Sequence, residues 1–87
     1  MERIGRRERI LKDERVTVHH IALFAAIVFL TGDKKAIHTS RRELLALSHI
    51  SNLMTYHKCM KQLVTLGYIS YLPSYHPKNG SRIGILD

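Results

Sequence analysis

Apolar residues form one uninterrupted run in the first half of the chain. Ten consecutive apolar residues, IALFAAIVFL, occupy positions 21–30. A helix that crosses a membrane needs about 20 such residues, so the run predicts a buried helix and no membrane span. We expect this helix to begin at Val18 with Thr17 as its N-cap, and to end after Leu30, close to Gly32.

A second group of apolar residues recurs at every third or fourth position, which places them on one face of a helix. Either Ser51 or Asn52 can cap this helix, and Gly67 can end it. A shorter helix precedes it and starts with a capping box formed by Ser40 and Glu43. The pattern therefore predicts a short helix, a turn and a longer helix. The residues expected on the buried face of the longer helix are Leu53, Tyr56, Cys59, Met60, Leu63 and Leu66.

The C-terminal part of the chain predicts a β-hairpin. Residues 68–72 are rich in aromatic and β-branched side chains, and a proline ends this run. Asn79-Gly80 is a strong turn signal, after which residues 81–86 return as a second strand. Gly84 interrupts the return strand and indicates a β-bulge there.

The charge of the chain is strongly positive. There are 14 Lys and Arg against 7 Asp and Glu, and the pI is near 10.0. This excess favours a polyanionic partner, nucleic acid first and an anionic membrane surface second. Between Glu43 and Asp87 there is no acidic residue, so the half of the chain that holds the longer helix and the hairpin is purely basic.

Residues 1–15 are predicted to form a charged N-terminal arm, followed by one folded domain over residues 16–87. Basic and acidic residues alternate in the arm, which fits a solvated terminus or an arm that follows DNA phosphates or embraces a second subunit. The helix from Val18 to Leu30 is apolar nearly all round and must be covered on most sides. We therefore expect a homodimer formed through this helix and the arm.

The predicted helices and hairpin together resemble the winged helix-turn-helix family of DNA-binding proteins. The resemblance extends from Thr17 to Leu86, and its most specific part is KCMKQLVTLGYI at residues 58–69. It implies an α+β, mostly α, fold: a three-helix winged helix-turn-helix with a small antiparallel sheet and a β-hairpin wing. It also implies that residues 36–39 form a short strand that pairs with the wing.

The resemblance implies that the longer helix enters the major groove of double-stranded DNA. Asn52, Thr55 and His57 are then expected near base edges. Lys58 is expected at bases or phosphates, and Lys61 at phosphates. The side-chain chemistry of asparagine favours adenine, and that of lysine favours guanine. The complete predicted DNA-contacting set is Arg41, Arg42, Ser51, Asn52, Thr55, His57, Lys58, Lys61, Gln62, Lys78, Asn79 and Arg82.

The function expected from these features is double-stranded DNA binding, by a transcriptional regulator or an accessory protein of a mobile element. The alternative is a winged helix that serves as a protein–protein interaction module and does not bind DNA. The apolar helix that begins at Val18 keeps this alternative open, because it needs an additional partner surface.

No enzymatic chemistry is expected. The acidic residues show no paired spacing, and the chain has no phosphate-binding glycine loop. The six histidines include no i, i+4 pair, and the single cysteine, Cys59, is expected to be buried. We therefore expect no metal site, no cofactor and no small-molecule effector. One unpaired thiol and the lack of a secretory signal predict a cytoplasmic protein.

Overall fold

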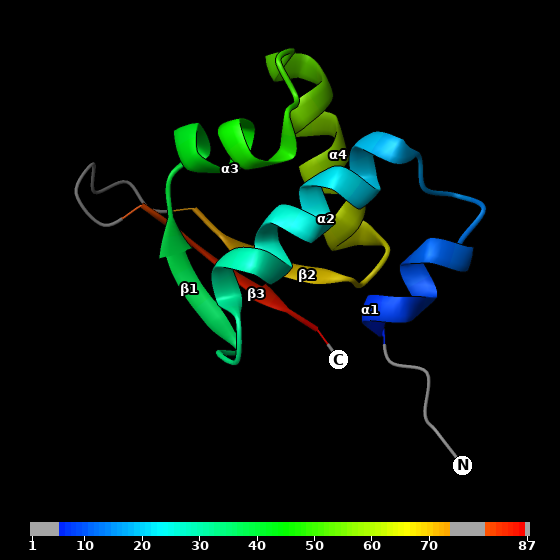
Figure 1. The fold of residues 1–87 in the computed structure, drawn as a ribbon, viewed down its shortest axis with the longest axis horizontal. Helices are drawn as coiled ribbons and strands as arrows, with labels where there is room; N and C mark the ends of the chain where they lie inside the picture. The colour runs from blue at the N-terminus through cyan, green and yellow to red at the C-terminus, as the bar shows by residue number, and fades with distance from the viewer. Residues whose placement is uncertain (1–5, 74–79, 87) are drawn as a thin grey trace.

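Helix α2 (Val18–Thr31) lies at the centre of the fold, and the two helices of eight or more residues that follow it, together with the sheet, are arranged around it (Figure 1). The computed structural model describes residues 6–73 and 80–86. Within them the chain forms the predicted α+β fold, mostly helical, with a three-stranded antiparallel sheet. The elements are α1 (Arg6–Arg9), the 3₁₀ helix η1 (Ile10–Lys12), α2 (Val18–Thr31), β1 (Ala36–Thr39), α3 (Arg41–Ser48), α4 (Leu53–Thr65), β2 (Ile69–Leu72) and β3 (Ser81–Ile85).

The prediction for the central helix is confirmed. Leu23 and Ile27 of α2 are fully buried, and the helix packs against α3, α4, β1 and β3. Its other side is not covered, since Val18 and Phe29 are 75% and 73% exposed. None of the helices in residues 6–73 has both the length and the hydropathy that a bilayer span requires.

The start of α2 is fixed by a capping box formed by Thr17 and His20. The Thr17 amide donates to His20 Nδ1 over 2.9 Å, so this ring nitrogen carries no proton. The proton is therefore on Nε2, which donates to Gln62 Oε1 of α4. His20 thereby joins the beginning of α2 to α4, although only 4% of the residue is exposed.

The sheet has the strand order β1-β3-β2, with both pairings antiparallel. The short strand β1 pairs with the return strand of the hairpin, as the family resemblance implies. Ile83 and Ile85 of β3 face the core and are 0% and 8% exposed. The sheet therefore closes the core on the side away from α3 and α4 (Figure 1).

The bulge expected at Gly84 is wrong. Gly84 pairs with Ala36 on one side and Ser70 on the other, in regular register. The reason for glycine is a close approach of another part of the backbone. A Cβ atom at this position would lie 2.7 Å from the Lys35 carbonyl oxygen and 2.9 Å from Ser70 Oγ.

The short helix, turn and longer helix are confirmed as α3, residues 49–52 and α4. Ser40 caps α3 by accepting a hydrogen bond from the Glu43 amide. The turn contains no glycine; instead His49 adopts a left-handed conformation with φ 61°. Ile50 follows it and is 4% exposed, so burial of its side chain anchors the turn.

Gly67 ends α4 with a Schellman motif. Its φ is 83°, its amide donates to the Val64 carbonyl, and the Tyr68 amide donates to the Leu63 carbonyl. This motif turns the chain directly into β2. Tyr68 is buried, and its ring packs edge-on against Phe24 of α2 at a centroid distance of 5.9 Å.

The described part of the predicted N-terminal arm packs onto the domain. Ile10 is 1% exposed and belongs to the hydrophobic core. Asp13 accepts a hydrogen bond from the Tyr68 hydroxyl over 2.7 Å and forms an ion pair with Arg15. The Arg15 guanidinium, together with the Tyr68 hydroxyl, holds the pKa of Asp13 well below its usual range.

Candidate nucleic-acid interface

The predicted set includes four arginines and lysines on the two helices that follow β1, and all four are exposed. Arg41 and Arg42 are exposed at the start of α3. His57, Lys58 and Lys61 are exposed along α4. Among the others, Ser51, Asn52 and Arg82 are exposed, Thr55 and Gln62 are half-buried, and Lys78 and Asn79 lie outside the described residues.

These basic side chains form no ion pair with any side chain that the structure describes. Among the described side chains, those of residues 8–73 and 80–86, there is one ion pair, between Arg15 and Asp13. The basic side chains of α3 and α4 therefore have no acidic partner in this part of the chain, and their charge is available to an external anion.

Asn52 is the N-cap of α4, which settles the choice between it and Ser51. Its Oδ1 accepts hydrogen bonds from the amides of Met54 and Thr55, at 2.8 and 3.2 Å. The acceptor atom of Asn52 is thus engaged by the backbone. The remaining hydrogen-bonding group of the side chain is the Nδ2 amide, which only donates.

The first turn of α4 exposes apolar side chains. Met54 is 82% exposed and Leu53 is 45% exposed. Leu53 was expected on the buried face, but it lies at the edge of that face, because α4 begins at this residue and contacts the core only from Tyr56 onward. Sequence reasoning did not single out Met54 as a surface residue, since one methionine at a helix start gives no periodic signal.

Gln62 points inward. Its Oε1 accepts the hydrogen bond from His20 Nε2 described above, so part of this amide joins α4 to α2. The spacing of polar residues on α4 predicted a solvent-facing glutamine, but it could not reveal a buried histidine 42 residues away in the sequence.

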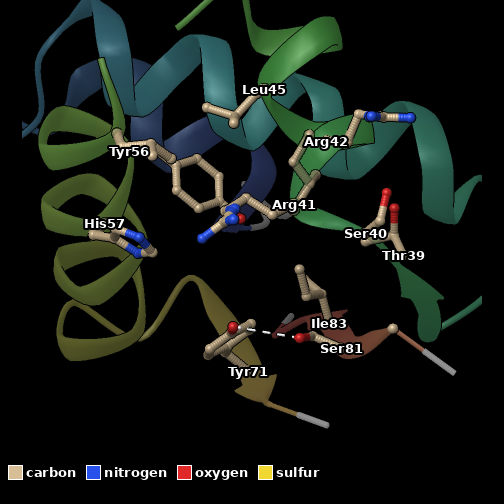
Figure 2. A pocket seen from close by; sticks show the side chains of 13 residues that line it. Thr39, Ser40, Arg41, Arg42, Leu45, Tyr56, His57, Tyr71, Ser81 and Ile83 are labelled. Atoms are coloured by element: carbon tan, nitrogen blue, oxygen red, sulfur yellow. Dashed lines mark hydrogen bonds between the residues drawn. The ribbon is translucent and has the colours of Figure 1, made fainter. Parts of the chain in front are cut away.

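An open groove of about 720 Å³ lies between α3, α4 and the ends of β2 and β3 (Figure 2). Figure 2 shows Arg41 extending from α3 into the space between Tyr56, His57 and Tyr71, whereas Arg42 points away from it. Tyr71 and Ser81 stand on the opposite wall, with their oxygens 3.4 Å apart. The groove therefore combines one guanidinium with several hydroxyl groups and the imidazole of His57.

Tyr56 forms part of the wall of this groove. Burial raises the pKa of its phenol to about 12, although the positive charge of Arg41 acts in the opposite direction. The hydroxyl therefore remains protonated at neutral pH and can donate a hydrogen bond.

Arg82 does not join the groove. On β3, Ser81 and Ile83 line the groove, and side chains alternate between the two faces of a strand. Arg82 consequently lies on the outer face of the sheet, beside its cross-strand partners His38 and Leu72. The structure separates it from the cations of α3 and α4.

A second concave surface of about 440 Å³ lies on the other flank of α4. Lys58 and Lys61 line it together with Arg15, which belongs to the segment before α2. Arg15 was not in the predicted set, because its local sequence mixes acids and bases and gives no net charge signal. Its ion pair with Asp13 fixes the guanidinium beside α4.

The described residues contain no group of three or more His, Cys, Asp or Glu side chains that could hold a metal ion. Cys59 is 3% exposed, as predicted, and burial raises the pKa of its thiol. The surface built by α3, α4 and the adjoining strands is thus suited to binding an anion through arginine, lysine and hydroxyl groups.

Comparison of the chain with protein-family models, curated proteins and solved structures found no match.

Proposed function

We propose that this protein binds double-stranded DNA as a winged helix-turn-helix, with α4 in the major groove. The observation that carries the proposal is the pair of exposed lysines on α4, Lys58 and Lys61, which have no acidic partner in the described residues. A concave surface flanks α4 on each side. The order of elements, α2-β1-α3-α4-β2-β3, is the order that the family resemblance implies. The cellular role we infer is transcription regulation or service to a mobile element.

The dimensions of α4 suit the proposed contact. Its 13 residues give a helix of about 20 Å, and the major groove, about 12 Å wide, admits one helix. With α4 in the groove, one DNA backbone lies against Lys58, Lys61 and Arg15. The other lies against Arg41 and the hydroxyls of the groove in Figure 2.

The first test is fluorescence anisotropy with mixed-sequence duplex DNA over a range of salt concentrations. Each phosphate contact contributes about −0.9 to the slope of log K against log salt, and we expect a wild-type slope of about −4 or steeper. Replacing both helix lysines, Lys58→Ala and Lys61→Ala, should reduce the magnitude of the slope by about one to two units.

The matched control is the double variant Lys34→Ala and Lys35→Ala, which replaces two exposed lysines in the turn between α2 and β1. This variant has the same change in net charge and should keep the wild-type slope within about half a unit, because phosphate contacts are local. No duplex binding at low salt would overturn the proposal, and equal loss in both variants would remove α4 from the contact.

A specific observation also supports self-association. The uncovered side of α2 carries Val18, Ala22, Ala25 and Phe29 at spacings of four, three and four residues, the spacing of a coiled-coil seam. Helix α2 contains no lysine, arginine, aspartate or glutamate. A contact through this face therefore keeps the lysines and arginines of two chains, each of formal charge +7, out of the interface.

We infer a homodimer in which two α2 helices pack antiparallel through this seam. Phe29 of one copy then lies opposite Val18 of the other, and the alanines near the twofold axis let the helices approach closely. The exposed side chain of Leu11, beside Phe29 in the same apolar groove, extends the contact. The same face would serve the alternative function, protein–protein interaction without DNA.

A further inference from the structure

The first turn of α4 presents an apolar surface at the place where a major-groove helix meets the bases. Met54 is 82% exposed, the largest exposed fraction among the large hydrophobic residues of the described chain. It takes no part in the core, which α4 contacts through Tyr56, Cys59, Met60 and Leu63. Folding therefore gives no reason for a methionine at this position.

Asn52, the polar residue near Met54, is restricted in which base groups its side chain can recognise. Reading adenine with both groups of an asparagine requires the side-chain oxygen to accept from N6 and the side-chain amide to donate to N7. The oxygen of Asn52 already accepts from two backbone amides at the start of α4. Asn52 can therefore only donate, and the expected preference for adenine loses its physical basis.

A surface made of a hydrogen-bond donor and an apolar group matches thymine. In the major groove thymine displays the O4 acceptor and the C5 methyl group, and it is the one standard base with an apolar substituent there. The methionine side chain is flexible and polarizable, so it adapts to a small apolar group.

We propose that Met54 is a specificity-determining residue that contacts the C5 methyl group of a thymine, while Asn52 Nδ2 donates to a base acceptor beside it. The inference rests on the proposed DNA binding by α4. The inference assigns the recognition of thymine to Met54. This residue carries no charge and therefore contributes nothing to the salt dependence of DNA binding.

The test removes the methyl group from the DNA. A preferred duplex is first selected from a random pool with the wild-type protein, and each thymine in it is then replaced singly by deoxyuridine. We expect one or two positions at which binding weakens about fourfold, the factor that corresponds to one buried methyl group. Substitutions at the remaining thymines should change binding by less than about 1.5-fold.

The variant Met54→Ala completes a double-mutant cycle. It should bind the thymine duplex about threefold to fivefold more weakly than wild type and should no longer distinguish thymine from deoxyuridine at the sensitive positions. The exposed position of Met54 and the high helix propensity of alanine leave the fold intact. As a control, Leu72→Ala removes an apolar side chain that is 65% exposed on the outer face of the sheet, and it should retain the discrimination.

The outcomes separate this inference from the proposal on which it rests. If the duplex is bound with the expected salt dependence but no thymine is sensitive to loss of its methyl group, the role of Met54 is overturned and DNA binding stands. The role is also overturned if Met54→Ala discriminates as well as wild type. If no duplex is bound at all, both proposals fail.

Discussion

The side chain of Asp13 attaches the charged segment before α2 to the folded domain. Its carboxylate accepts from the Tyr68 hydroxyl and pairs with Arg15, so it ties the segment before α2 to the end of α4. The alternating charges of this segment predicted a solvated arm. The contact that orders it joins residues 55 positions apart, which local sequence patterns do not report.

The contact predicts a specific dependence of stability on pH. Since the folded-state pKa of Asp13 lies below its ordinary value of 3.8, the contribution of this carboxylate to stability is complete above pH 3.8. The contribution is lost as the pH falls below 3.8 toward the folded-state pKa. The variant Asp13→Asn should therefore be less stable than wild type at about pH 6, and the difference should shrink at about pH 3 and below.

Urea denaturation followed by circular dichroism at both pH values measures this difference. Glu14→Gln is the matched control, because it removes the same charge from an adjacent exposed position, and at about pH 6 it should be closer in stability to wild type than Asp13→Asn is. A constant difference for Asp13→Asn would show that the carboxylate is not ionically stabilised in the folded protein.

At the same scale, sequence reasoning identified residue types correctly but not which of their atoms are free. It placed polar groups at Asn52 and Gln62, and the structure shows that one oxygen of each is already bonded within the protein. The capping role of Asn52 was foreseeable, because capping depends on neighbouring residues. The inward bond of Gln62 was not, because it depends on how two helices pack.

At the scale of elements, the helix starts and stops followed from the sequence. Ser40 and Gly67 act through backbone groups within a few residues, so their signals are local. The hairpin strands were predicted for the same reason. The strand β1 was expected from the family resemblance alone, since four residues give too short a period to detect.

Gly84 gives a prediction for the sheet. Its absent side chain makes room for the Lys35 carbonyl oxygen, which would lie 2.7 Å from a Cβ atom. Because that oxygen belongs to the backbone and accepts from the Ile85 amide, it cannot move without breaking a hydrogen bond. Gly84→Ala should therefore destabilise the protein by about 1–3 kcal/mol, measured by urea denaturation.

The double variant Gly84→Ala with Ser70→Ala separates the two atoms that crowd the site. It removes Ser70 Oγ, which would lie 2.9 Å from the new Cβ, but leaves the Lys35 carbonyl in place. We expect most of the destabilisation to persist. Full recovery of stability would show that the serine, and not the backbone approach, requires glycine here.

At the scale of the whole molecule, exposed lysines lie on α4, whereas α2 contains no lysine or arginine and exposes apolar side chains. The exposed residues of α4 include Lys58 and Lys61, whereas those of α2 include Val18 and Phe29. The overall class of fold, the central helix and the basic second half were predictable from the sequence. The two grooves beside α4 were not, because each is assembled from segments that only the tertiary fold brings together.

The apolar surface of α2 predicts self-association that depends on protein concentration. A seam of four side chains, two of them alanines, is small, so we expect monomer and dimer to exchange. Phe29→Glu places a charge at each end of the contact, opposite Val18 of the other copy, and should give a monomer at every concentration, measured by sedimentation velocity.

Leu72→Glu makes a comparable change on the outer face of the sheet, where the leucine is also exposed, and should leave the association unchanged. A wild-type mass that stays monomeric over a wide range of concentrations would contradict the inferred dimer.

The strand order has a consequence for how the protein is made. The central strand β3 is the last of the three in the sequence, and the two outer strands do not pair with each other. While the chain is being synthesised, β1 and β2 therefore have no strand partner until residues 81–85 leave the ribosome. We expect the sheet to form late and in one step, and the unpaired segments at residues 36–39 and 69–72 to be accessible to chaperones until then.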